Sequence, residues 1–169
     1  MSYRNKTYVI FDGDNDQWAY RFMKGGKAND RVDFDFDDAH EIFPMTYRAQ
    51  DEIYVKSKLT ERLKKSSQVL VLIGDHTKDL YKYVRWEIEL AIDLGLPIIA
   101  VNLNDKRVID TARCPAILRD RYVVHIPFKM KIIQYSLDNF PGEFSSIRGN
   151  EDGNRVYSDD VYKTLGLDQ

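Results

Sequence analysis

One glutamate in this 169-residue chain, Glu87, lies near the core-facing side of a predicted helix, where a carboxylate can have a functional role. Glu87 directly follows Trp86 and comes four residues after Tyr83, so on a helix the Tyr83 ring and the Glu87 carboxylate share a face. The next residue, Ile88, belongs to the apolar, core-facing side of the same predicted helix. The position therefore suits a functional carboxylate. The alternative is an exposed glutamate that pairs with Arg85 or nearby lysines.

The residues around Glu87 predict a strand, a polar turn, a helix and a second strand. Residues 69–73 (VLVLI) and 98–101 (IIAV) are unbroken aliphatic runs, which are typical of strands buried on both faces of a parallel sheet. Apolar residues recur at helical spacing over 81–94, and Gly95 followed by Pro97 ends that helix. The three elements predict a right-handed βαβ unit.

The rest of the chain extends this pattern into an α/β domain. The other expected elements are a strand at 7–11, a helix at 16–23 closed by Gly25 and Gly26, an edge strand at 32–37, a helix at 51–66, a strand at 121–128, a helix or extended arm at 129–139, a polar tail from Pro141 and a short helix within 158–167. This order predicts a flavodoxin-like, doubly wound, mostly parallel five-stranded sheet with helices on both faces. We expect a domain at 1–128 and a carboxyl-terminal extension at 129–169 that packs on or near it.

The helix expected at 51–66 is amphipathic. Its apolar positions Ile53, Val55, Leu59 and Leu63 are expected to face the core, while its lysines and arginines meet water.

An acidic turn, DGDND, follows the first predicted strand and begins with Asp12 and Gly13. Ligands of open α/β sheets bind just outside the carboxyl ends of the strands, so this turn is a candidate binding element. A strand ending in DxD resembles haloacid-dehalogenase phosphatases, but their later motifs are missing here. A calcium loop would need a glutamate where Met23 stands. The other interpretation is that these aspartates cap the following helix.

Composition limits the classes of function. The chain has 25 basic and 27 acidic residues and a formal net charge of −2, which argues against a general nucleic-acid or membrane-surface binder. The single cysteine, Cys114, cannot form a disulfide within the chain, and the three histidines are too scattered to predict a metal site. The amino-terminal apolar run is too short for a signal peptide, and no stretch of 18 apolar residues occurs. We expect a cytoplasmic protein.

The segments VLVLIGDHTKD, YVRWE and IELAIDLGLPIIAVNLN together resemble the TIR-like domain of bacterial Thoeris defence proteins of the ThsB type. In that family a VxVLIG strand leads to a helix with W-x-x-x-E and then to a strand of the form IIxxxxN. The resemblance covers roughly residues 7–104. Two departures stand out: Tyr83 replaces the usual tryptophan, and DGDND replaces a serine-containing turn.

The resemblance implies a reaction. TIR enzymes cleave the bond between nicotinamide and ribose in NAD, and Glu87 matches their catalytic glutamate. A carboxylate there can stabilise the oxocarbenium-like ribose that forms when nicotinamide leaves. NAD is then the substrate, and no cofactor or metal is expected. The expected walls of the pocket are Tyr83, Trp86, Phe11, Asp12, Gly13, Asp75 and His76.

The resemblance also implies partners. Defence TIR proteins often turn NAD into linear or cyclic ADP-ribose that activates a separate effector, and they respond to phage. We therefore expect self-association, an effector and a phage-derived trigger. The competing hypothesis is a non-enzymatic TIR-like or receiver-like module for signalling or assembly. An enzyme should place Glu87 in an open cleft with Phe11, Asp12 and Asp75, whereas a module can have that cleft filled by side chains.

Overall fold

The computed structural model describes residues 6–28, 37–38, 52–80, 83–147 and 153–167. Its centre is a parallel sheet with the strand order β2-β1-β3-β4-β5-β6. The strands are β1 (Lys6–Ile10), β2 (Asp37–Asp38), β3 (Gln68–Ile73), β4 (Ile98–Asn102), β5 (Val124–Pro127) and β6 (Arg155–Val156). The first five have the flavodoxin-like order and confirm the predicted α/β fold. The sixth comes from the carboxyl-terminal region and pairs with β5.

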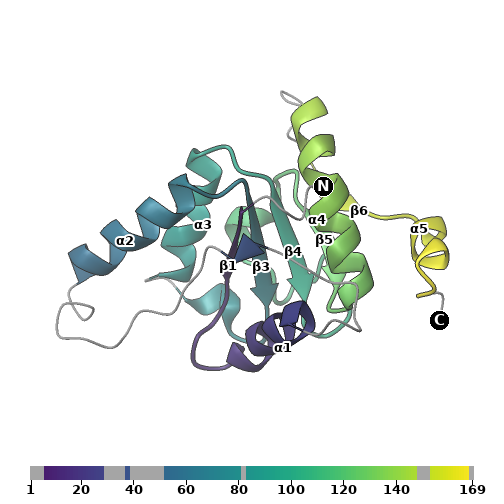
Figure 1. Cartoon of the computed structure of the whole chain (residues 1–169), viewed down its shortest axis with the longest axis horizontal. Coiled ribbons are helices and arrows are strands. Elements are labelled where there is room, and N and C mark those ends of the chain that lie inside the picture. Colours follow the sequence, from purple (N-terminus) through teal and green to yellow (C-terminus); the bar gives the residue numbers. More distant parts are fainter. Residues whose placement is uncertain (1–5, 29–36, 39–51, 81–82, 148–152, 168–169) are drawn as a thin grey trace.

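Helices cover both faces of the sheet and give a three-layered domain (Figure 1). Helices α2 and α3 lie on one side of the strands, and α4 lies on the other. The helices are α1 (Gln17–Ala28), α2 (Glu52–Lys64), α3 (Val84–Asp93), α4 (Met130–Ser146) and α5 (Asp159–Thr164), with single 3₁₀ turns at η3 (Thr77–Asp79) and η4 (Ala116–Leu118). Each main strand is thus buried between two helical layers, as its unbroken apolar sequence requires.

The two-residue period of β1 decides which of its side chains meets which helix. Val9 packs in the core between the sheet and helices α1 and α4. Tyr8 and Ile10 point the other way and pack in the core that the sheet shares with α2 and α3. Tyr8 thereby faces the layer that carries Glu87.

The structure confirms the predicted βαβ unit and corrects two helix predictions. Gly95 ends α3 with a φ of 69°, as expected. Helix α1, however, continues through Gly25 and Gly26 to Ala28. Glycine only weakens a helix, by about 1 kcal/mol, and the buried Tyr20 and Met23 anchor this one to the core. In α2, Ile53 is 81% exposed instead of facing the core, because it lies in the first turn, before Leu59 and Leu63 reach the sheet.

The region after β5 is more regular than the sequence suggested. Helix α4 runs through Pro141, where a polar tail was expected to begin. Phe140 is fully buried, and the Glu143 carboxylate accepts hydrogen bonds from the Tyr122 hydroxyl (3.0 Å) and the Arg155 guanidinium (2.7 Å). These contacts offset the backbone hydrogen bond that proline removes.

Two predictions about organisation remain open. The alternating strand predicted at 32–37 falls almost entirely outside the described residues, which begin again with β2 at Asp37. The boundary at residue 128 also stays a prediction. The helix that follows it, α4, packs against β4 and β5 and buries Ile132, Ile133 and Leu137 in the same core as the earlier strands.

Candidate active site

Glu87 lies in the first turn of α3 and points its carboxylate at the sheet. Its side chain is only 4% exposed. The hydroxyl of Tyr8, a fully buried residue of β1, donates a hydrogen bond to Glu87 Oε2. The Glu87 backbone N–H donates to the Tyr83 carbonyl at 2.8 Å, which fixes the start of the helix. Tyr8 and Glu87 are 79 positions apart in the sequence.

Burial dominates the electrostatics of this contact. It raises the pKa of Glu87 from 4.5 to about 8, while the hydrogen bond from Tyr8 acts in the opposite direction. Burial also raises the pKa of Tyr8, and the nearby Glu87 raises it further. Both side chains are therefore neutral at pH 7. A protonated carboxyl group next to a phenol avoids the large cost of a buried charge.

The contacts on the exposed face of α3 show that Glu87 is not an exposed glutamate paired with Arg85. Arg85 pairs with Glu89, with 2.9 Å between Arg85 Nε and Glu89 Oε1, and both of these side chains are about half exposed. The carboxylate that meets solvent and pairs with Arg85 is thus Glu89. Glu87 belongs to the buried face.

The aromatic residues of the motif pack beside Glu87's layer. Tyr83 is the N-cap residue of α3, and both it and Trp86 are partly buried against the core formed with α2. The ammonium group of Lys56, on α2, lies 5.5 Å from the centre of the Trp86 ring, within range of a cation–π contact. Both rings are thus held on the same helix as the carboxylate.

The residues at the carboxyl end of β1 were expected to line a pocket with Glu87, but they make other contacts. Phe11 stacks on Tyr20 with 4.6 Å between ring centres and packs against the core on the opposite face of the sheet from Tyr8. Asp12 is 1% exposed and accepts hydrogen bonds from the backbone N–H of Asp14 (3.0 Å) and from the Asn15 amide nitrogen (2.7 Å). Asp12 therefore organises the turn that precedes α1. Gly13 is exposed in that turn.

Asp75 and His76 line a hollow of about 420 Å³ at the carboxyl edge of the sheet. Its other walls are Asn15, Asp16, Trp18, Gly74, Leu103 and Arg113. Arg113 forms an ion pair with Asp75. Asp16 is 6% exposed, and burial followed by the charges of Asp12 and Asp75 raises its pKa.

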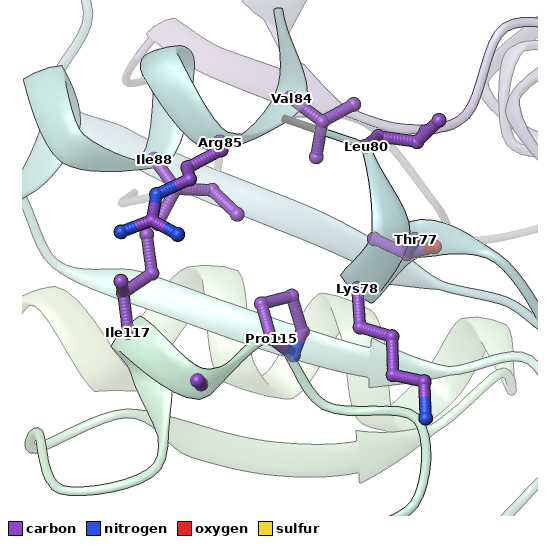
Figure 2. A pocket seen from close by; sticks show the side chains of 9 residues that line it. Thr77, Lys78, Leu80, Val84, Arg85, Ile88, Pro115 and Ile117 are labelled. Atoms are coloured by element: carbon purple, nitrogen blue, oxygen red, sulfur yellow. The ribbon is translucent and has the colours of Figure 1, made fainter. Parts of the chain in front are cut away.

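A smaller hollow, of about 80 Å³, lies between η3, α3 and η4. Figure 2 shows Val84 and Ile88 entering it from α3, with Pro115 and Ile117 on the other side. Thr77 connects this hollow with the larger one, because its hydroxyl accepts the Gly74 N–H at 2.9 Å. Glu87 stands between Val84 and Ile88 in sequence but turns to Tyr8 instead.

The structure therefore divides the predicted site into three groups. Glu87 lies with Tyr8, and Tyr83 and Trp86 lie along the same helix; Asp75 and His76 share the hollow with Asp16; Phe11 lies across the sheet. Sequence reasoning missed Tyr8, whose only signal was a hydroxyl within the buried strand TYVIF. Among the described residues, no cluster of histidine, cysteine and acidic side chains could hold a metal ion. Nor does any described helix have the length and apolar character to cross a membrane.

A parallel 2-1-3-4-5 sheet with a buried glutamate at the start of the helix after β3 defines a TIR-like α/β domain. The family model described as Thoeris protein ThsB, TIR-like domain, matches residues 8–108, and the chain belongs to this family. It is thus a TIR-like domain related to Thoeris defence. It is also similar, at 14% identity and a TM-score of 0.43, to a crystal structure of a conserved protein from Enterococcus faecalis V583, over 98% of this chain and 99% of that one. No curated protein matches it.

Proposed function

We propose that this chain cleaves the bond between nicotinamide and ribose in NAD, with Glu87 as the catalytic carboxylate. One observation carries the proposal: the glutamate that matches the TIR catalytic position is buried at 4% exposure and has a pKa raised to about 8. Glutamate is almost never fully buried without a partner, and the hydrogen bond that Glu87 receives comes from a neutral phenol, Tyr8. Acidic groups with strongly shifted pKa values concentrate at functional sites.

The chemistry needs a negative charge beside the ribose. Loss of nicotinamide leaves positive charge on the sugar, and a carboxylate in a water-poor site stabilises that charge strongly. The Tyr8 hydroxyl holds the carboxyl group in one orientation. Since Glu87 is closed against Tyr8, we propose that this contact opens when NAD enters. Tyr83 or Trp86 then provides an aromatic wall for nicotinamide.

We propose that the rest of NAD binds in the hollow lined by Asp75 and His76. It lies at the carboxyl edge of the sheet, where α/β domains bind ligands. Arg113, in its ion pair with Asp75, supplies hydrogen-bond donors there, and the exposed ring of Trp18 supplies a surface for stacking. Asp12 and Gly13 form the turn that leads into the wall of this hollow at Asn15, whereas Phe11 stacks on Tyr20 against the core.

We also propose a product, an effector and a means of regulation for this reaction. The product is a linear or cyclic ADP-ribose that activates a separate effector in the cytoplasm. Self-association and a phage-derived trigger regulate the reaction. These steps rest on the relation to Thoeris proteins.

The test is nicotinamide release from NAD by the concentrated protein, with and without lysate from phage-infected cells. Glu87→Gln is compared with Glu89→Gln, which removes an exposed carboxylate two residues along the same helix. We expect release by the wild type and by Glu89→Gln, and its loss in Glu87→Gln. Equal release by all three would overturn Glu87 as the catalytic residue.

A second candidate function is a non-enzymatic signalling or assembly module. It is favoured by the same closed contact, because the Tyr8 hydroxyl and the surrounding core fill the space in front of the carboxyl group. In that case wild type and Glu87→Gln are equally inert under both conditions, and both still self-associate or bind a partner.

A further inference from the structure

A second hollow, of about 490 Å³, lies away from Glu87, where β4 and β5 end and the carboxyl-terminal residues return to the domain. Its walls are Asp105, Arg107, Pro127, Lys129, Tyr162, Gly166 and Leu167. A volume of this size is within the usual range for small-molecule sites. The β4 and β5 segments, the start of α4 and the end of α5 all contribute to it.

Arg107 is held in place within this hollow. Its guanidinium lies 4.0 Å from the centre of the Tyr162 ring and donates a hydrogen bond to the Leu167 carbonyl. A guanidinium has five N–H donors, so this arrangement leaves donors for a ligand while fixing the orientation of the fork. Arginine held in this way is suited to bidentate binding of phosphate.

The charges around the hollow favour an anion. Lys129 Nζ lies 3.3 Å from Asp105 Oδ2, so that pair is neutral in sum. Among the residues that line the hollow, Arg107 then remains as a surplus positive charge. The ammonium of Lys131 adds another nearby, 3.6 Å from the point that a Cβ on Gly166 would occupy.

Two further features also point to a ligand. Tyr162 is fully buried, yet its hydroxyl has no hydrogen-bond partner in the described part of the chain. Lys129 is the N-cap residue of the 17-residue helix α4, and its side chain makes no capping hydrogen bond. The first N–H groups of a helix and its dipole attract anions, and the residue just before them, Lys129, lines the hollow.

We propose that this hollow binds a small phosphate-bearing molecule, with Arg107 and Lys129, the latter at the amino-terminal end of α4, holding the phosphate. Pro127 and Leu167 give apolar contact for an attached group such as a nucleoside. The site is separate from Glu87, so it stands or falls independently of NAD cleavage.

The test is calorimetric titration of the full chain at low salt with inorganic pyrophosphate, AMP and ADP-ribose. Arg107→Gln and Lys129→Gln are compared with Arg121→Gln, which removes an exposed cation just before β5, at the opposite edge of the sheet. We expect saturable binding by the wild type and by Arg121→Gln, and affinity about tenfold weaker in each of the other two. Tighter binding of AMP or ADP-ribose than of pyrophosphate identifies a nucleotide site; the reverse order identifies a site for free phosphates.

Absence of saturable binding with all three probes, or equal binding by all four proteins, would overturn the site. Arg107 also braces α5, so circular dichroism is recorded for each variant. If Arg107→Gln is unfolded, Lys129→Gln decides alone, because its half-exposed side chain leaves the core intact.

Discussion

The hydroxyl of Tyr8, in the middle of the first strand, donates a hydrogen bond to the carboxyl group of Glu87, in the first turn of α3. Tyr8 is fully buried and Glu87 nearly so, and the pair joins the sheet to the helix that carries the TIR motif. Burial keeps both side chains of this pair protonated.

Glu87 should make stability fall as pH rises. Its pKa is about 8 in the folded chain and 4.5 when exposed, so between these values the unfolded state has lost a proton that the folded state keeps. The free energy of unfolding should therefore decrease by about 1.4 kcal/mol for each pH unit inside this window. Urea titrations from pH 5 to 8.5 measure it. Glu87→Gln should flatten this slope, and an unchanged slope would contradict the raised pKa.

Tyr8→Phe should destabilise the fold by about 1–3 kcal/mol, because it leaves a buried carboxyl group without its donor. The pKa of Glu87 should rise further, since the Tyr8 hydrogen bond lowers it. Tyr162→Phe is the matched control: its hydroxyl is buried without a partner among the described residues, so its loss should be neutral or stabilising. Urea unfolding measures both variants, and equal losses of unfolding free energy would contradict a specific Tyr8–Glu87 contact.

NAD cleavage, if Glu87 must be ionised, should accelerate from pH 6 to 8.5. A carboxyl group with a pKa near 8 is mostly protonated at pH 7, and kcat/KM reports the ionisation of the free enzyme. Nicotinamide release is measured across this range with the wild type and Glu89→Gln, which should give the same profile. A profile that is flat above pH 6 would assign the reaction to a different ionisation.

Gly74→Ala should disturb the hollow that holds Asp75 and His76. A Cβ on Gly74 would overlap the carboxyl group of Asp16, which is itself buried. We expect a loss of about 1–3 kcal/mol in thermal or urea unfolding. Gly13→Ala, with open space around its Cβ, should stay close to the wild type. Adding Asp16→Ala to Gly74→Ala should recover part of the loss; no recovery would place the strain elsewhere.

Ile53→Ala should change stability by less than about 0.5 kcal/mol, because the side chain is 81% exposed. Leu63→Ala, in the same helix but fully buried, should cost about 2–5 kcal/mol. Urea unfolding of both variants separates the amphipathic pattern of the sequence from the face that the helix actually buries.

Local pattern was enough to predict β1, β3, β4, β5 and the central helix, but not β6. The runs that became β3 and β4 are aliphatic without interruption, and Gly95 marks the end of α3. Where packing competes with propensity, the pattern failed: α1 passes Gly25 and Gly26, and α4 passes Pro141, because buried aromatic side chains hold both helices.

The candidate site was predictable only in part. The spacing of Tyr83 and Glu87 placed the carboxylate on the inner side of a helix, which the structure bears out. Its partner could not be inferred, since periodicity within TYVIF says which side chains share a face but not which one meets a helix 79 positions later. The separation of Phe11 from Glu87 has the same origin, because adjacent pleats of β1 decide the face on which each side chain lies.

The pairing of β6 with β5 has a consequence for solubility. The two residues of β6 form the ladder, and they cover the outer edge of β5, a strand whose four residues are all buried. A chain shortened before residue 153 would present that edge to other molecules, and bare parallel edges template aggregation. We therefore expect β6 to protect this edge of the sheet from pairing with the strands of other molecules.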